Sequence, residues 1–172
     1  FAFSTDVTDL RRTQWRLAAV TQDMGIGLWE WHHPDGALDF NDELLALVGY
    51  SRGDVTSDPL DWLNACIHPD DGEARRKVIA DLFQGRLPRA QVRMRVRHRQ
   101  GHFVWVQEAL RIVDRDDATG SVRLIGLAQD IGELKAREAE LEALMQQLEL
   151  RIAQRTQALV EARREAERAN AA

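Results

Sequence analysis

The sequence predicts an α+β domain: a five-stranded antiparallel sheet with short helices on one face, flanked by an N-terminal helix and a long C-terminal coiled-coil helix. Segments rich in β-branched and aromatic residues occur as a pair near residue 30 and as a group of three after residue 90. Short helical patterns separate the two groups, an order typical of helices packed on one face of an antiparallel sheet. After residue 131, charged heptads replace the strand pattern and predict an extended helix.

The composition limits both the size of the domain and its partners. At 172 residues the chain is long enough for one core of ordinary size and an extended element. A net charge of −5 and a pI near 5.6 disfavour general affinity for nucleic acid or anionic membranes. Cys66 is the only cysteine, which indicates a reducing compartment, and no apolar run approaches the roughly 18 residues of a membrane span. We therefore expect a cytoplasmic fragment that contacts neither membrane nor nucleic acid.

The first residues resemble the end of another domain. "FAFSTDVTDLRR" aligns without gaps on "IGLAQDIGELKA", which places Asp6 over Asp130. Because the two joints are about one domain length apart, residues 1–7 are interpreted as the end of a preceding domain of the same kind. Residues 8–24 follow as a connecting helix. Its apolar residues recur at heptad spacing: Leu10, Leu17 and Met24. Since Phe1 is not an initiator methionine, we interpret the chain as part of a longer protein.

A hairpin and a short helix open the predicted domain. Residues 25–33 read as a strand, the turn "PDG" follows, and residues 37–40 return as the second strand. Asn41 is expected to cap a short helix that Gly49 ends. Residues 51–67 predict a loop with one or two short helical turns.

A longer helix is predicted for "HPDDGEARRKVIADLFQG". Asp70 or Asp71 is expected to cap it, with acidic residues in the first turn. Its apolar residues recur on one face: Val78, Ile79, Leu82 and Phe83. This pattern predicts a helix with one side against the core.

Three further strands are predicted within residues 91–130. "QVRMRVRHR" alternates strictly, with Val92, Met94 and Val96 on one face. Arginines form a basic stripe on the other face: Arg93, Arg95, Arg97 and Arg99. An anionic ligand or nucleic acid is one interpretation of this stripe. Because the whole chain is acidic, we favour a solvated or interface surface that Glu108 and neighbouring acids neutralise.

From Leu134 onward the heptads hold one register and predict a two-stranded coiled coil. The apolar seam comprises six residues: Leu134, Leu141, Met145, Leu148, Ile152 and Leu159. Glu138 and Arg155 interrupt the seam and weaken it. A helix with so narrow an apolar stripe has nothing to pack on within its own chain, so we expect a homodimer formed with a second copy.

Six motifs occur in the order and spacing of a PAS domain: "GLWEW", "PDG", "FNDELLALVGYS", "IHPDD", "RHRQGHFVWV" and "QDIGELK". Residues 25–131 thereby resemble the PAS subtype that ends in an Asp-Ile-Thr motif, common in bacterial signalling proteins. The tail within residues 132–172 is similar to the helix upstream of the phosphoacceptor histidine helix in sensor histidine kinases. The sequence departs from the pattern at Gly132, where threonine is usual, and at His32 and His33, where an acidic residue is frequent.

The resemblance implies a sensory and dimerisation module of a multidomain bacterial signal-transduction protein. A sensor histidine kinase is the first candidate for this parent protein. Asp130, Ile131 and Gly132 would relay a signal from the last strand into the coiled-coil helix. A PAS-like domain upstream and a kinase domain downstream would belong to the same parent chain. Two alternatives stay open: a cyclic-dinucleotide cyclase or phosphodiesterase as output, and a structural dimerisation spacer that binds no ligand.

The resemblance also implies a possible ligand cavity between the inner sheet face and the short helices. Seven residues are candidates to line it: Leu44, Leu45, Val48, Trp62, Ile67, Ile79 and Phe83. We favour the alternative that these side chains fill the core. A cofactor-binding redox or gas sensor is a further alternative. We expect no cofactor, because the flavin-reactive cysteine motif is missing around Cys66 and a haem histidine is missing from the following helix.

No catalytic constellation is discernible in the sequence. A Ser-His-Asp or Cys-His set, a phosphate loop and a metal-ligand cluster are all missing, so we expect the chain to catalyse nothing by itself. Cys66 is expected to be a buried small apolar residue. His98 and His102 flank a tight hairpin, but without a third ligand nearby they make a poor metal site. ATP-dependent histidine phosphorylation would be the activity of the parent protein alone.

Overall fold

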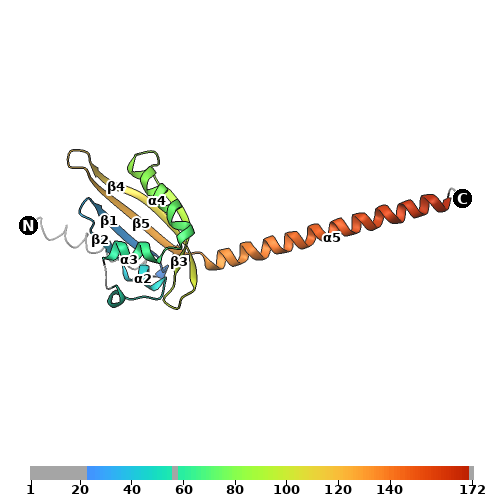
Figure 1. Ribbon diagram of the computed structural model, residues 1–172, viewed down its shortest axis with the longest axis horizontal. Coiled ribbons are helices and arrows are strands. Elements are labelled where there is room, and N and C mark those ends of the chain that lie inside the picture. The colour runs from blue at the N-terminus through green and yellow to red at the C-terminus, as the bar shows by residue number, and fades with distance from the viewer. Residues whose placement is uncertain (1–22, 56–57, 171–172) are drawn as a thin grey trace, which may run out of the picture. The chain divides into compact units, whose positions relative to one another are not determined.

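The computed structural model describes residues 23–55 and 58–170, and the predicted segment 1–7 and most of the predicted helix 8–24 lie outside these residues. The described elements are β1 (Gly27–His33), β2 (Leu38–Phe40), α2 (Asp42–Ala46), η1 (Arg52–Asp54), α3 (Pro59–Cys66), α4 (Pro69–Phe83), β3 (Ala90–Arg97), β4 (Phe103–Asp116), β5 (Ser121–Asp130) and α5 (Gly132–Asn170). Two strands, short helices and three further strands follow one another, which confirms the predicted α+β class (Figure 1).

The five strands form one antiparallel sheet in the spatial order β2-β1-β5-β4-β3. The first and last strands of the chain are therefore neighbours, with Gly27 opposite Ala128 and His33 opposite Val122. On its other side, β5 pairs with β4 along its whole length. This topology places β5, which precedes α5 in the chain, in the centre of the sheet.

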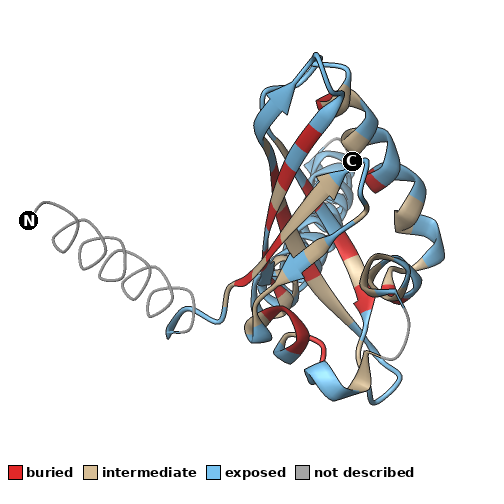
Figure 2. Cartoon of the chain, turned by 90° about the vertical axis from the view of Figure 1, so that its left-hand side faces the viewer, coloured by how far each residue is buried: buried red, intermediate tan, exposed pale blue. Residues whose placement is uncertain are grey.

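One face of the sheet carries the core. Val92, Met94 and Val96 of β3 are buried, as their alternation predicts. Leu110 of β4 and Leu124 of β5 belong to the same apolar cluster and are at most 1% exposed. Figure 2 shows the buried positions as separate bands along the strands. Full burial of each such side chain contributes about 1.5–3 kcal/mol, which makes this face the main source of stability.

Helices α2, α3 and α4 cover that face, and side chains at their first turns fix where they begin. Asn41 caps α2 as expected, since its Oδ1 accepts a hydrogen bond from a first-turn backbone N–H at 3.2 Å. Helix α4 forms where it was predicted, but the predicted cap, Asp70 or Asp71, was wrong: His68 caps the helix, with Nδ1 accepting from the Asp70 N–H at 3.2 Å. Asp71 does not cap the helix because its Oδ2 accepts from the backbone N–H and the guanidinium of Arg95 instead.

The chain divides into two compact units, residues 1–132 and residues 133–172. The second unit consists almost wholly of α5, whose 39 residues span about 58 Å at 1.5 Å per residue. None of the described residues of this helix is buried. Within the part of the chain that the structure describes, no helix has both the length and the apolar character that crossing a membrane requires.

Candidate functional site

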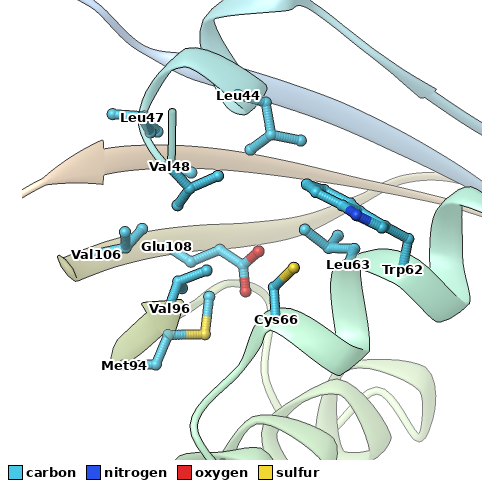
Figure 3. Close-up of a pocket in the computed structure, with 11 residues that line it drawn as sticks. Leu44, Leu47, Val48, Trp62, Leu63, Cys66, Met94, Val96, Val106 and Glu108 are labelled. Atoms are coloured by element: carbon cyan, nitrogen blue, oxygen red, sulfur yellow. The ribbon is translucent and has the colours of Figure 1, made fainter. Parts of the chain in front are cut away.

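A narrow cavity lies between the inner face of the sheet and helices α2 and α3 (Figure 3). Its volume is about 30 Å³, and a cavity needs about 10–15 Å³ on this measure to hold one water molecule. Eleven residues line it: Leu44, Leu47, Val48, Trp62, Leu63, Cys66, Met94, Val96, Val106, Glu108 and Ala128. All are apolar except Glu108, whose carboxylate points towards Cys66. The cavity therefore has room for a water molecule and would have to expand to admit an organic ligand.

The structure brings together some of the seven residues considered for such a cavity. Three of them line it: Leu44, Val48 and Trp62. Leu45 is 1% exposed and packs elsewhere in the core. Ile67 forms an isolated antiparallel bridge with Val96. Phe83 contacts the aromatic rings of β1, and Ile79 lines a second cavity on another side of α3.

A buried polar network borders the narrow cavity, and the sequence reasoning missed it. Glu108 Oε2 accepts a hydrogen bond from Arg75 Nε at 2.7 Å, and Oε1 accepts one from Trp29 Nε1 at 2.8 Å. Arg75 also donates through Nη1 to Asn64 Oδ1 at 3.3 Å. Glu108 and Arg75 are only 1% and 4% exposed, so each compensates the buried charge of the other. The network joins β4, β1, α3 and α4.

The sequence contains a signal for this network. Glu108 lies two residues from both Val106 and Leu110, so its side chain is on the same buried face of β4 as theirs. Arg75 lies one turn before Ile79 and two turns before Leu82, on the same side of α4. One acid and one base on two apolar faces that must pack together indicate a buried ion pair.

The proposed neutralisation of the arginine stripe by Glu108 was wrong, because Glu108 faces the opposite side of the sheet. Arg95 instead pairs with Asp71 at 2.8 Å, and Arg99 pairs with Asp54 at 3.2 Å. Hydrogen bonds from the Arg95 guanidinium hold the pKa of the Asp71 carboxyl below its ordinary value, and the desolvation that opposes this shift is smaller. The acids that pair with Arg95 and Arg99 thus come from α4 and η1.

Cys66 is buried, as expected, at 8% exposure. Burial raises the pKa of its thiol, so Cys66 is protonated and weakly nucleophilic at neutral pH. His98 and His102 stack with their ring centroids 4.4 Å apart. Among residues 23–55 and 58–170, no three His, Cys, Asp or Glu side chains are grouped as metal ligands. Among the described residues, a ligand at this site could be held by apolar contacts and hydrogen bonds.

The three residues of the predicted relay form a tight joint. The Ile131 N–H donates to the Trp105 carbonyl oxygen at 2.9 Å, and the Ile131 side chain is buried. Asp130 Oδ1 accepts from the Gly132 N–H at 2.6 Å. The Asp130 carboxylate thereby caps the first turn of α5, where the usual threonine hydroxyl is missing. Ile131 is therefore hydrogen-bonded to the sheet, and the hydrogen bond between Asp130 and Gly132 caps the first turn of α5.

Helix α5 presents an apolar stripe along one side. The six residues of the predicted seam are each at least 44% exposed: Leu134, Leu141, Met145, Leu148, Ile152 and Leu159. Glu138, one of the polar residues in the seam, forms an ion pair with Lys135 at 2.8 Å within the helix. Leu150 is also exposed but lies outside the seam. The six seam residues thus leave an exposed apolar stripe along α5.

Comparison with known proteins identifies the arrangement. The family model described as PAS fold matches residues 37–128, more than half of the chain. A search of curated protein sequences returned no match.

Solved structures share the architecture. A sensory box histidine kinase/response regulator from Burkholderia thailandensis superimposes with a TM-score of 0.65 at 24% identity, covering 77% of this chain and 97% of that chain. The N-terminal domain of a diguanylate cyclase with PAS/PAC sensor from Marinobacter aquaeolei gives 0.53 at 26% identity, covering 64% and 98%. A domain of a light and redox sensing histidine kinase from Haloarcula marismortui gives 0.53 at 28% identity, covering 67% and 97%.

Proposed function

The chain belongs to the PAS fold family, and from that premise we propose that it is a sensory and dimerisation module of a multidomain bacterial signal-transduction protein. In this proposal the module passes a signal from β5 through Asp130, Ile131 and Gly132 into α5. Relatives that are themselves domains of sensory proteins support the assignment.

The observation that carries the proposal is the joint at the end of β5. Ile131 alone separates β5 from α5, and its N–H bonds to the Trp105 carbonyl of the neighbouring strand. Asp130 belongs to β5, while its carboxylate caps the first helical N–H. Because no flexible loop intervenes, a shift of β5 against β4 changes the direction in which α5 starts. Such a joint converts a change in the sheet into a movement of a helix.

In this proposal, the dimer formed through α5 passes that movement on to the output domain of the parent protein. The exposed seam residues follow the spacing of a two-stranded coiled coil. Glu138 and Arg155 are polar residues in the seam and reduce the stability of the pairing. A seam of limited stability can exchange between two arrangements that differ by little free energy, which a switch requires.

A histidine kinase is the first candidate for the output of the parent protein. The tail of the chain is similar to the helix that precedes the phosphoacceptor histidine helix in such kinases, and one relative is part of a histidine kinase. A cyclic-dinucleotide cyclase is the second candidate, because another relative is the N-terminal domain of a diguanylate cyclase. The upstream PAS-like domain and the cytoplasmic location are further parts of the proposal.

The relay is tested by measuring distances between the two copies of α5. Cys66→Ala removes the native thiol, and Arg164→Cys places a spin label on α5 away from the seam. Double electron–electron resonance then reports the separation of the two labels in the dimer. Asp130→Ala removes the carboxylate cap and should shift or broaden the distance distribution. Asp117→Ala, in the turn between β4 and β5, is the matched control and should leave the distribution unchanged.

Two results would contradict the relay. An unchanged distribution in Asp130→Ala would show that the joint does not control α5 and would favour a structural dimerisation spacer. A sample without any distance between labels would show that α5 does not pair.

A further inference from the structure

The hairpin between β3 and β4 is held against the segment that follows α2. The Arg99 N–H donates a hydrogen bond to the Val48 carbonyl oxygen at 2.9 Å. The His98 ring packs directly on Gly49, where an added Cβ would overlap the imidazole. We call these contacts of His98 and Arg99 with Val48 and Gly49 the latch. Because the Val48 side chain lines the narrow cavity, the latch also fixes part of the cavity wall.

The closed latch depends on a neutral imidazole at His98. Its Nδ1 accepts a hydrogen bond from the Gln100 N–H at 3.2 Å, inside the tight turn. Protonation of Nδ1 would turn this acceptor into a donor that faces another donor. The His102 ring stacks on the His98 ring, with centroids 4.4 Å apart and planes inclined by 22°. Protonation of both rings would therefore stack two positive charges, which repel each other.

The hairpin and η1 supply no charge that would offset this repulsion. Arg97 and Arg99, the neighbours of His98 in the chain, are cations themselves. Asp54 of η1 is already paired with Arg99 at 3.2 Å. Hydrogen bonds from Ser51 hold the pKa of the Asp54 carboxyl below its ordinary value, so this ion pair persists in mild acid.

The acids at the start of α4 are also engaged elsewhere. Asp71 pairs with Arg95 at 2.8 Å, and Asp70 lies 3.5 Å from the Nδ1 of His68. Among the described residues, the histidines that have a carboxylate within ion-pair distance are His32 and His68. The segment after α2 contributes backbone and apolar groups to the latch. His98 and His102 would thus carry positive charge without a carboxylate partner.

We propose that His98 and His102 make the latch pH-sensitive, closed while both imidazoles are neutral and open when both are protonated. Histidine is the side chain whose charge ordinarily changes between about pH 5 and 8. Because the closed form disfavours the protonated rings, closure is favoured at the upper end of this range and lost as the pH falls through it. Opening releases the Val48 carbonyl oxygen from the hairpin.

The position of the latch connects it to the relay joint. Strand β4 begins at Phe103, immediately after His102, and the Trp105 carbonyl oxygen two residues later accepts the Ile131 N–H. A movement of the hairpin therefore acts on the strand to which the joint is bonded. The latch rests on the hairpin contacts alone, and only its effect on α5 rests on the proposed function.

Amide hydrogen exchange of the whole ¹⁵N-labelled chain tests the latch through the Arg99 N–H. Dividing the intrinsic exchange rate by the measured rate at the same pH gives a protection factor that reports opening alone. Between about pH 7.5 and pH 5 the protection factor of the Arg99 N–H should fall at least about tenfold, because a hydrogen bond is lost and two charges about 4 Å apart repel. The Leu124 N–H, in the central strand of the sheet, should keep its protection.

Two variants and a change of salt identify the cause of the fall. His102→Gln removes the second charge and leaves the His98 ring on Gly49, so the fall should become several times smaller. His32→Gln removes a histidine of β1 that pairs with Glu30, and it should retain the full fall. Sodium chloride at about 1 M, where the Debye length is about 3 Å, should reduce the fall in the wild type.

Three results would overturn the proposal. An Arg99 protection factor that is the same at both pH values would show that protonation does not open the latch. A fall as large in His102→Gln as in the wild type would show that the second imidazole has no part in it. A fall shared by the Leu124 N–H would indicate acid unfolding of the whole sheet. None of these results depends on the spin-label distances in α5, so the latch and the relay are tested independently.

Discussion

The Arg75 Nε lies 2.7 Å from Glu108 Oε2, and this ion pair is almost completely removed from solvent. The pair links the long helix α4 to the middle of the sheet and lies between the two cavities, since Glu108 lines one and Arg75 the other. Trp29 and Asn64 satisfy further hydrogen-bonding groups of the pair. A buried charge that loses its partner is strongly unfavourable, so the two residues depend on each other.

Glu108→Gln should destabilise the domain by about 3–5 kcal/mol, because it leaves the Arg75 cation buried without a counter-charge. Urea unfolding followed by tryptophan fluorescence measures the change. Arg99→Gln removes the exposed pair with Asp54 in the same domain and should cost about 1 kcal/mol or less. Equal effects of the two substitutions would contradict the role assigned to the buried pair.

A double substitution that replaces both members of the pair with apolar residues also tests whether Arg75 and Glu108 depend on each other. Glu108→Leu combined with Arg75→Met leaves no buried charge and should recover much of the stability lost in Glu108→Gln. The Trp29 N–H loses its acceptor in this variant, so the recovery should be incomplete. A double variant less stable than Glu108→Gln would show that the network contributes more than mutual neutralisation.

Gly126→Ala should destabilise the domain by about 1–3 kcal/mol through overpacking. A Cβ at Gly126 of β5 would overlap the indole ring of Trp29 on the neighbouring strand, and that ring also donates to Glu108. Gly53→Ala is the matched control because a Cβ there meets open space. The thermal unfolding midpoint should be lower for Gly126→Ala than for Gly53→Ala. Equal midpoints would contradict the close approach of Trp29 to β5.

Asp71→Asn should reduce stability at neutral pH and lose this effect in acid. Hydrogen bonds from Arg95 lower the pKa of Asp71 in the folded chain, so its carboxylate stabilises the fold above the unfolded value, about 3.9. That stabilisation disappears as the pH falls through the lower folded pKa. Urea unfolding at pH 7 and below pH 4 should show the difference from the wild type shrinking with acidification, whereas Asp117→Asn should show little difference at either pH. A difference that grows in acid has the wrong sign for this account.

The sequence allowed the strands and their faces to be predicted because a period of two is a local property. Val92, Met94 and Val96 face the core as their alternation indicates, and β5 ends at Asp130 as expected. Glu108 was wrongly predicted to lie on the solvated face of the sheet, because an acid in a strand is ordinarily solvated. Only a partner 33 residues away, Arg75, makes its burial favourable.

The cap of α4 and the cavities depend on contacts that local patterns do not encode. Asp71 has the residue type of a helix cap, but Arg95 on β3 binds it, and His68 takes the capping position. Whether Leu44 or Ile67 reaches a cavity depends on the packing of three helices on the sheet. The spacing of apolar residues identifies the core, but it does not determine where side chains leave space.

Sedimentation velocity of the chain and of two leucine variants tests the central claim, that α5 pairs through its seam. Leu148 and Leu150 are both exposed leucines of α5, at 48% and 60%, but only Leu148 belongs to the seam. The wild type and Leu150→Glu should sediment as dimers of the 19.6 kDa chain, and Leu148→Glu should sediment as a monomer or a much weaker dimer. A monomeric wild type, or a Leu148→Glu dimer as strong as that of Leu150→Glu, would contradict the account.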